Sequence, residues 1–198
     1  NLISFIEDAC ENIRPMAEHQ KVTLSLEKPR GDGMAWFDAD KLDKIIYNLL
    51  SNAIKYNKVR GKIKVSLSLS KDQAVITIKD NGIGMSKEKM KHLYTRFFDG
   101  DYRKQNQPGT GIGLSLTHDL VKLHHGNIQC ESQEGEGTTF TITLPIRKSA
   151  YAPDEIDNSD KPNAVNQEAI RQASLEMKQV SQPVSDEKPK LAPVRHSI

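Results

Sequence analysis

Two short stretches with strictly alternating apolar residues constrain the fold of this chain more than any other feature. Every second residue is apolar from 63 to 69 and again from 74 to 78, and the polar pair Lys71 and Asp72 lies between the two stretches. A period of two residues places one face of a strand in a core and the other face outside it. The pattern predicts an antiparallel hairpin whose apolar face must be covered by a second layer.

Apolar residues at helical spacing supply that second layer. They predict amphipathic helices from Leu2 to about His19, over 38–57 with Asp38 or Asp40 as the cap, over 90–98 and over 114–124. Further strands are expected at 22–26, 128–132 and 140–144. Together these elements predict an α+β fold with helices on one face of a largely antiparallel sheet.

The composition of the chain changes near residue 146. All 12 glycines precede residue 138, whereas five of the nine prolines follow residue 146. The segment 147–198 holds a single aromatic residue, Tyr151, with 8 basic and 8 acidic side chains, and so little apolar surface does not offset the entropy of ordering. We therefore predict a folded domain over 1–146 and a largely disordered linker over 147–198, with a short helix or docking segment at 163–180.

Charge and cysteine content exclude several classes of function. A net charge of +2 among 27% charged residues is not that of a nucleic-acid-binding surface. No apolar run is long enough to span a membrane and no signal pattern opens the chain, so we expect a cytoplasmic fragment without membrane contact, from a parent that could itself be membrane-anchored. Cys10 and Cys130 lie far apart, which favours a reducing compartment and no zinc site.

One stripe of the helix predicted over 38–57 carries polar side chains. Asn48, Asn52, Lys55 and Tyr56 stand at positions i, i+4, i+7 and i+8, so they project from one edge of the helix. Amide oxygens suit a Mg²⁺ ion that keeps several waters and shares phosphate ligands, and a lysine adds positive charge for those phosphates. A solvated helix flank has the same spacing, so this stripe alone leaves both interpretations open.

A carboxylate and two glycine-rich segments form the second set of candidates. Asp80 continues the buried face of the second hairpin strand, where it needs hydrogen-bond donors. The exocyclic amine of adenine would supply one, and so would the amides of the turn at Gly82 and Gly84. The glycines at 109–113 precede a helix, where backbone N–H groups converge on an anion or simply form a turn, and their spacing is neither that of a P-loop nor that of a dinucleotide fingerprint.

Taken together, four motifs resemble a known family. Asn-Leu-Leu-Ser-Asn-Ala-Ile-Lys-Tyr (48–56), Asp-Asn-Gly-Ile-Gly-Met (80–85), Arg-Phe-Phe (96–98) and Gly-Thr-Gly-Ile-Gly-Leu (109–114) occur in this order. They closely resemble the asparagine, first glycine, phenylalanine and second glycine boxes of sensor histidine kinases. The resemblance spans about residues 1–146 and implies the Bergerat ATP-binding fold, an α/β sandwich with a mixed, mostly antiparallel sheet and helices on one face.

The resemblance also implies a role for each motif residue. Asn52 would ligate Mg²⁺, Asn48 would lie close to the metal and phosphates, Lys55 would contact phosphate and Tyr56 would pack near adenine, with Asn48 and Lys55 carrying the catalysis. Asp80 would accept a hydrogen bond from the adenine amine and Phe97 would anchor a lid. The pocket wall would comprise Gly82, Ile83, Gly84 and Met85, and the lid hinge and phosphate-facing turn would comprise Gly109, Thr110, Gly111, Ile112, Gly113 and Leu114.

The identity of residue 48 bears on the reaction. In related ATPases such as gyrase, mismatch-repair proteins and heat-shock chaperones, the position resembling Asn48 usually holds a glutamate that activates water. An amide does not accept a proton near neutral pH, so attack by water is left unassisted and the phosphoryl group is kept for another acceptor. The resemblance thus implies transfer of the γ-phosphoryl of Mg-ATP to a histidine in two-component signal transduction.

The acceptor itself is not recognisable in this sequence. None of the six histidines stands in a phosphoacceptor motif of the His-Glu-x-x-Thr-Pro type, so we expect a monomeric fragment of a homodimeric parent that is not competent for autophosphorylation alone. Its expected partners are the phosphoacceptor histidine domain of the parent and a response-regulator receiver domain, which a hybrid sensor would carry in the same chain. Two alternatives remain open: a nucleotide-binding or docking module without transfer, and a serine kinase of the anti-sigma type.

Overall fold

The computed structural model of the protein describes residues 1–95 and 113–157. A five-stranded sheet in the order β1-β2-β3-β5-β4 forms one layer. Its strands are β1 (Thr23–Glu27), β2 (Lys62–Leu69), β3 (Gln73–Asp80), β4 (Asn127–Gln133) and β5 (Gly137–Pro145). Only the β1–β2 pair is parallel, and the three other pairs are antiparallel, which confirms the predicted hairpin and the mostly antiparallel sheet.

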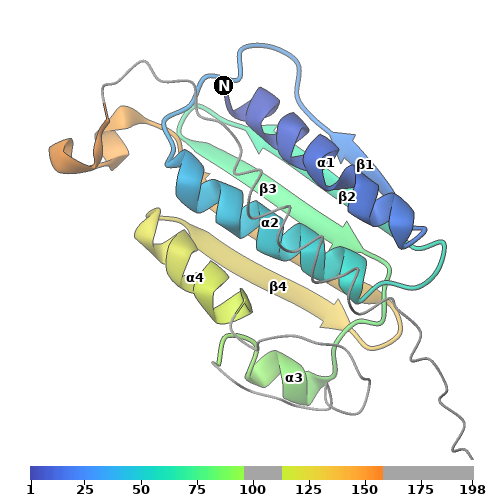
Figure 1. Ribbon diagram of the computed structural model, residues 1–198. Helices are drawn as coiled ribbons and strands as arrows, with labels where there is room; N and C mark the ends of the chain where they lie inside the picture. Colours follow the sequence, from blue (N-terminus) through green and yellow to red (C-terminus); the bar gives the residue numbers. More distant parts are fainter. Residues whose placement is uncertain (96–112, 158–198) are drawn as a thin grey trace, which may run out of the picture.

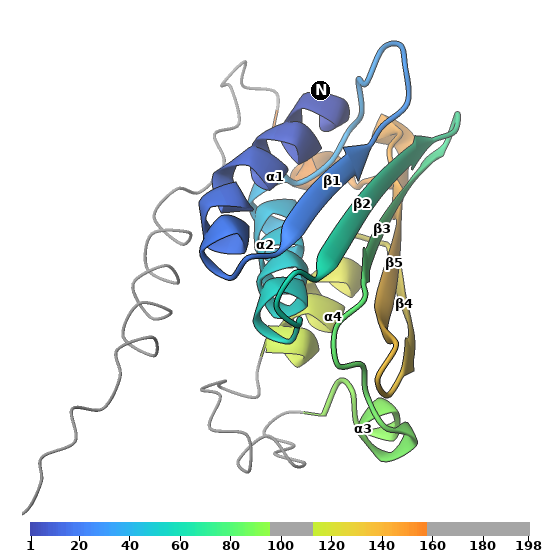
Figure 2. The same cartoon turned by 90° about the vertical axis from the view of Figure 1, so that its right-hand side faces the viewer.

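Three helices form the second layer. They are α1 (Leu2–His19), α2 (Ala39–Lys55) and α4 (Gly113–Leu123), and they lie side by side across the sheet in Figure 1. Figure 2, turned by 90°, shows all three on the same face of the sheet, while the opposite face carries no helix among the described residues. Asp38 is the residue that caps α2, since its Oδ1 accepts the backbone N–H of Lys41 at 3.0 Å.

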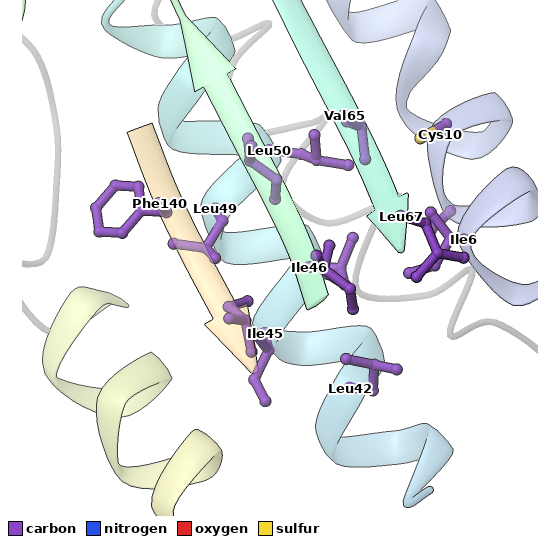
Figure 3. Packing of buried hydrophobic residues seen from close by; sticks show 14 of the residues in the cluster. Ile6, Cys10, Leu42, Ile45, Ile46, Leu49, Leu50, Val65, Leu67 and Phe140 are labelled. Atoms are coloured by element: carbon purple, nitrogen blue, oxygen red, sulfur yellow. The ribbon is translucent and has the colours of Figure 1, made fainter. Parts of the chain in front are cut away.

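The core lies between these two layers. Leu42, Ile45 and Ile46 of α2 are fully buried, and in Figure 3 the apolar residues of this helix face the strands. The inner face of β2 and β3 contributes the alternating residues of the hairpin, of which Val65 and Ile76 are also fully buried. The alternating apolar residues of the strands and the apolar residues of α2 therefore pack together in a single core.

The helix predicted over 90–98 differs from the structure. The helix α3 comprises Lys87–Lys91, begins at Ser86, whose Oγ accepts the Lys89 N–H, and gives way to a turn at residues 92–94. Met90 and Tyr94 are partly buried against the core at a spacing that also suits a helix. The Tyr94 ring packs on His118 of α4 with centroids 4.6 Å apart, so the turn serves to bring this ring onto α4. Residues 96–98 lie outside the described part of the chain.

The chain remains in contact with the domain for a short distance after β5. Two single-turn 3-10 helices, η2 (Lys148–Ala150) and η3 (Pro153–Glu155), follow the sheet. Tyr151 lies between them and donates its hydroxyl to the backbone oxygen of Pro145 at 2.6 Å. The domain boundary at residue 146 stays a prediction, and the helix or docking segment expected at 163–180 lies outside the described residues. Within 1–95 and 113–157, no helix is long and apolar enough to cross a bilayer.

Candidate functional site

The ends of α2 and β3 lie near α3 and the start of α4 in Figure 1. Residues from the ends of α2 and β3 and from the start of α4 line a narrow pocket. Its volume is about 40 Å³, enough for a few water molecules. Most of the lining is apolar, and its polar groups belong to Asn52, Tyr56, Asp80 and Thr138. The lining residues are Leu49, Asn52, Ala53, Tyr56, Asp80, Ile83, Gly84, Met85, Leu114, Thr138 and Phe140.

Asp80 provides the charged group of this pocket. Its Oδ1 accepts the backbone N–H of Gly82 at 2.9 Å and that of Thr138 at 3.3 Å. Burial raises the pKa of the Asp80 carboxyl above its usual range, and the two backbone N–H groups lower it by a smaller amount. Both recorded hydrogen bonds use Oδ1, so Oδ2 is the oxygen able to accept a hydrogen bond from a bound ligand. The turn-capping role and the ligand role considered from the sequence are thus compatible.

The glycines after Asp80 permit close contact between backbone segments. A Cβ atom at Gly82 would lie 2.4 Å from the carbonyl oxygen of Tyr56, at the end of α2. Gly84 has a φ of +65°, and a Cβ there would lie 1.9 Å from the carbonyl oxygen of Gln133. The turn therefore packs directly on the end of α2 and on the end of β4. This contact places Ile83 and Met85 in the pocket wall, where the sequence analysis expected them.

The predicted polar stripe of α2 is divided between two neighbouring environments. Asn52 and Tyr56 line the pocket. One turn earlier, Asn48 Nδ2 donates to Thr117 Oγ1 of α4 at 3.3 Å. The Thr117 hydroxyl donates its own proton to the Gly113 oxygen at 2.8 Å, so it is the acceptor of the bond from Asn48. The Asn48 amide oxygen does not take part in this bond. Lys55 places its ammonium 5.5 Å from the centre of the Tyr56 ring, beside the pocket.

Part of the predicted nucleotide site lies outside the described residues. This holds for Phe97 and for the segment comprising Gly109, Thr110, Gly111 and Ile112. The two remaining residues of the second glycine motif are placed: Gly113 is the first residue of α4, and Leu114 lines the pocket. The start of α4 therefore faces the same pocket as Asp80 and Asn52, as the motif order predicts.

Several pocket residues were not identified from the sequence. Thr138 and Phe140 reach the pocket through the sheet, because β5 pairs with β3 and sets Thr138 opposite Asp80 and Phe140 opposite Ile78. Ser132 supports this wall by accepting the Met85 N–H at 2.8 Å. Leu49 and Ala53 belong to the apolar stripe of α2. The alternation of β5 was the available signal, but the strand order was needed to use it.

The described residues provide no preformed metal cluster at this site, and a larger hollow on the surface is separate from it. Within the described residues, no group of three or more histidine, cysteine or acidic side chains is arranged to hold a metal ion. The Asn52 amide oxygen fits a Mg²⁺ ion that arrives with phosphate ligands and retains waters. A larger hollow of about 320 Å³ lies on the outer face of the sheet beside Glu27, Ser66 and Thr77, and it shares no residue with the four motifs.

Residues 37–148 match the family described as histidine kinase-, DNA gyrase B- and HSP90-like ATPases. Among curated relatives, the chain is 32% identical over 146 residues to the sensor histidine kinase RppB of Synechocystis, covering 73% of this chain and 32% of that protein. It is 34% identical over 136 residues to the sensor histidine kinase WalK of Bacillus subtilis, covering 67% of this chain and 22% of that protein. The chain thus spans at most about a third of these relatives' lengths.

Solved structures support the same fold. The nucleotide-free catalytic domain of the histidine kinase ThkA superposes with a TM-score of 0.64 at 22% identity, covering 74% of this chain and 93% of that one. The mycobacterial sensor histidine kinase MprB superposes with a TM-score of 0.61 at 22% identity, covering 74% of this chain and 96% of that one. With the family match over residues 37–148, the fold and its pocket show that this chain belongs to the histidine kinase-, DNA gyrase B- and HSP90-like ATPase family, with sensor histidine kinases among its relatives.

Proposed function

We propose that the domain binds Mg-ATP in the pocket at Asp80 and transfers the γ-phosphoryl group to a histidine on a separate dimerisation and phosphotransfer domain. The observation that carries this proposal is the convergence of Asp80, Asn52 and the start of α4 on one pocket. Relatives named as sensor histidine kinases support the choice of acceptor. The parent protein would then act in two-component signalling in the cytoplasm, with a response-regulator receiver domain downstream.

The apolar part of the pocket suits a purine base. Leu49, Ile83 and Phe140 provide apolar lining, and Asp80 Oδ2 at the end of β3 can accept a hydrogen bond. A carboxylate accepts from the 6-amino group of adenine, whereas the 6-oxo group of guanine would repel it. The pocket therefore favours ATP over GTP.

The polar edge of α2 suits the phosphates. Asn52 would hold Mg²⁺ through its amide oxygen, and Lys55 would bind a phosphate oxygen from the next turn of the helix. The ion supplies charge neutralisation at the phosphates when it is bound. The N-terminus of α4, which begins at Gly113 next to the pocket residue Leu114, would add positive potential for the same phosphates.

Residue 48 determines which acceptor is used. The Asn48 amide donates to Thr117 and has no basic group to activate water. The γ-phosphoryl group is therefore preserved until a nucleophilic imidazole is presented by another domain. This arrangement supports a kinase rather than a hydrolase.

The first test is a calorimetric titration of ATP and of GTP into the full chain, with and without Mg²⁺. We expect ATP to bind, Mg²⁺ to strengthen binding, and GTP to bind at least about tenfold more weakly, the effect of leaving a charged acceptor without its donor. The control variant is Asp80→Asn, which keeps the size of the side chain. Equal binding of ATP and GTP would contradict the assignment of Asp80.

The second test follows phosphate from γ-labelled ATP to isolated phosphoacceptor domains of related sensor kinases. We expect label on histidine, which is lost in acid and retained in alkali. Acid-stable label on serine would instead support a serine kinase of the anti-sigma type. ATP binding without transfer to any acceptor would leave a nucleotide-dependent docking module as the function.

A further inference from the structure

His124 lies at the end of α4 in a fully enclosed position. Its side chain is 1% exposed, although histidine is a polar residue. It contacts two segments distant in sequence: the start of α2 at Asp38 and the segment after β5 at Tyr151. The rings of His124 and Tyr151 meet edge to face with centroids 5.6 Å apart. A buried imidazole of this kind must satisfy both of its nitrogen atoms.

The directions of the hydrogen bonds specify where the proton of His124 lies. The backbone N–H of Asp38 donates to Nε2 at 2.8 Å, so Nε2 is an acceptor and carries no proton. The Tyr151 hydroxyl donates to the Pro145 oxygen at 2.6 Å and lies 3.1 Å from Nδ1. Since that hydroxyl has used its proton, Nδ1–H is the donor to Tyr151. His124 is therefore neutral, with its proton on Nδ1.

This histidine provides a polar connection between the start of α2 and the end of α4. Nearer the pocket, Asn48 on α2 donates to Thr117 on α4. Farther away, Asp38 at the start of α2 donates to His124 just after α4 ends. The two bonds fix the position of α4 along α2, and α4 carries Gly113 and Leu114 at its other end. Loss of the bond at His124 would release the end of α4 from the start of α2.

Burial has the largest influence on the charge state of His124 and lowers its pKa below the usual range. A hydrogen bond to its own backbone and the nearby Asp38 carboxylate raise the pKa by less, and Lys41 and His125 lower it further. Asp38 is itself paired with Lys41, and Glu155 on η3 pairs with His125 at 2.9 Å. The hydroxyl of Tyr151, whose pKa burial raises, stays protonated in the same pH range.

We propose that His124 is a positioning residue, held in its Nδ1–H form by Tyr151, which fixes α4 against α2 and makes nucleotide affinity fall on acidification. When Nε2 gains a proton, it faces the Asp38 N–H donor to donor, and the contact between the two helices opens. The helix that presents Gly113 and Leu114 to the pocket is then no longer fixed. The nucleotide part of this inference rests on the proposed function, whereas the proton position and the helix contact do not.

The test uses the full chain with His124→Gln, His124→Ala and Tyr151→Phe, and His19→Gln on the exposed end of α1 as the matched control. Glutamine has an oxygen to accept from Asp38 and an N–H to donate to Tyr151, but it does not titrate. Long-range ¹H–¹⁵N NMR reports the protonated nitrogen of His124. Affinity for a non-hydrolysable ATP analogue is measured from pH 8 to pH 5. Ionisation of the nucleotide affects all variants equally, so a difference between variants reports on the protein.

We expect wild type and His19→Gln to show Nδ1–H at pH 8. Between pH 8 and pH 5, the fold-loss of nucleotide affinity in these two proteins should be about five times that in His124→Gln. His124→Gln should bind better than His124→Ala at pH 8. Tyr151→Phe should produce a mixture of the two neutral ring forms. An Nε2–H ring in wild type, or the same acid dependence in wild type and His124→Gln, would overturn the proposal. If no variant binds nucleotide at any pH, the proposed function fails, and the NMR result still decides the proton position.

Discussion

At the scale of single residues, Asp80 combines a binding role with a cost in stability. Because burial raises its pKa, the folded chain binds a proton at Asp80 more tightly than the unfolded chain. Its contribution to stability is therefore greatest below the pKa of the unfolded state and is lost as the pH rises through the higher folded-state pKa. At neutral pH the ionised carboxylate is retained for its ability to accept a hydrogen bond from a ligand.

We accordingly predict opposite effects of Asp80→Asn on stability and on binding. The variant should melt at the same temperature as wild type or higher at pH 7, because a neutral amide is less costly to bury. ATP affinity should fall by about 10-fold to 100-fold, since a hydrogen bond to a charged acceptor contributes about 1.5–3 kcal/mol. Thermal melts and calorimetric titration on the same preparations check both halves. A variant that lost stability and binding together would indicate a purely structural Asp80.

Asn48 permits a prediction about the fate of the phosphoryl group. Replacing it by glutamate supplies a general base near the predicted phosphate position, so ATP hydrolysis should rise by about 10-fold or more. Asn48→Gln is the matched control, because it has a similar length and no base. Both changes disturb the bond from Asn48 to Thr117, so the difference between them isolates the base. Phosphate release is the measurement, and equal rates would show that residue 48 does not face the reacting phosphate.

At the scale of elements, two glycines with positive φ allow the cost of backbone strain to be distinguished from the cost of a steric clash. Gly84 (φ +65°) and Gly135 (φ +82°) share the left-handed conformation, but a Cβ would lie 1.9 Å from the Gln133 oxygen at Gly84 and meets nothing within 4 Å at Gly135. Gly135→Ala should cost about 1–2 kcal/mol through strain alone. Gly84→Ala should cost more and should also weaken ATP binding. Urea unfolding of both variants checks this, and equal costs would contradict the close contact of the turn with β4.

Most elements were predictable because their burial has a simple period. The alternation in β2 and β3 and the apolar stripe of α2 each have one buried face, so the residue pattern and the structure agree. The region around Met90 and Tyr94 was not predictable, because residues packed from a turn have the same spacing as a helix.

The site divides in the same way. Asp80 and Asn52 were expected at the nucleotide and Leu114 in the phosphate-facing turn, since each belongs to a contiguous motif, and all three line the pocket. Thr138 enters the pocket through its pairing with β3, and such pairing across 58 residues is not visible in local sequence. Tyr151 was assigned to a linker on composition, yet a single aromatic hydroxyl with two partners attaches its segment to the domain. Composition averages over a window and therefore misses one well-placed side chain.

At the scale of the whole molecule, the described part of the chain contains a single core between one sheet and one helix layer. Such an arrangement requires no second copy to bury its core residues, so we predict that the chain is a monomer. Sedimentation should give the monomer mass at all concentrations from about 1 to 100 μM, a range over which a dimer of micromolar affinity would change from largely dissociated to largely associated. A mass that increased with concentration would show that this chain contributes its own dimer interface.

The end of the folded unit gives the last prediction. Chains ending at residue 146 and at residue 157 differ by the segment that holds Tyr151, which bonds to Pro145 and His124, and Lys148, whose ammonium lies 5.0 Å from the Trp36 ring. Without Tyr151, the Nδ1–H of His124 loses its acceptor in an enclosed position. The shorter chain should therefore be less stable by about 1–3 kcal/mol, the cost of leaving a buried polar group unsatisfied.

The matched control is the chain ending at 157 with Tyr151→Phe, which keeps the segment and removes the hydroxyl. If the hydroxyl accounts for the attachment, this variant should lose most of the stability that the shorter chain loses, as measured by urea unfolding at pH 7.5. The shorter chain should also lose part of the pH dependence of unfolding assigned to His124, because it exposes the imidazole, whereas Tyr151→Phe keeps the imidazole buried and should retain it. Because the folded-state pKa of His124 is lowered, wild type loses stability as the pH falls below the imidazole pKa of the unfolded chain, about 6.5. Equal stability of the 146-residue and 157-residue chains at every pH would instead place the end of the domain at β5.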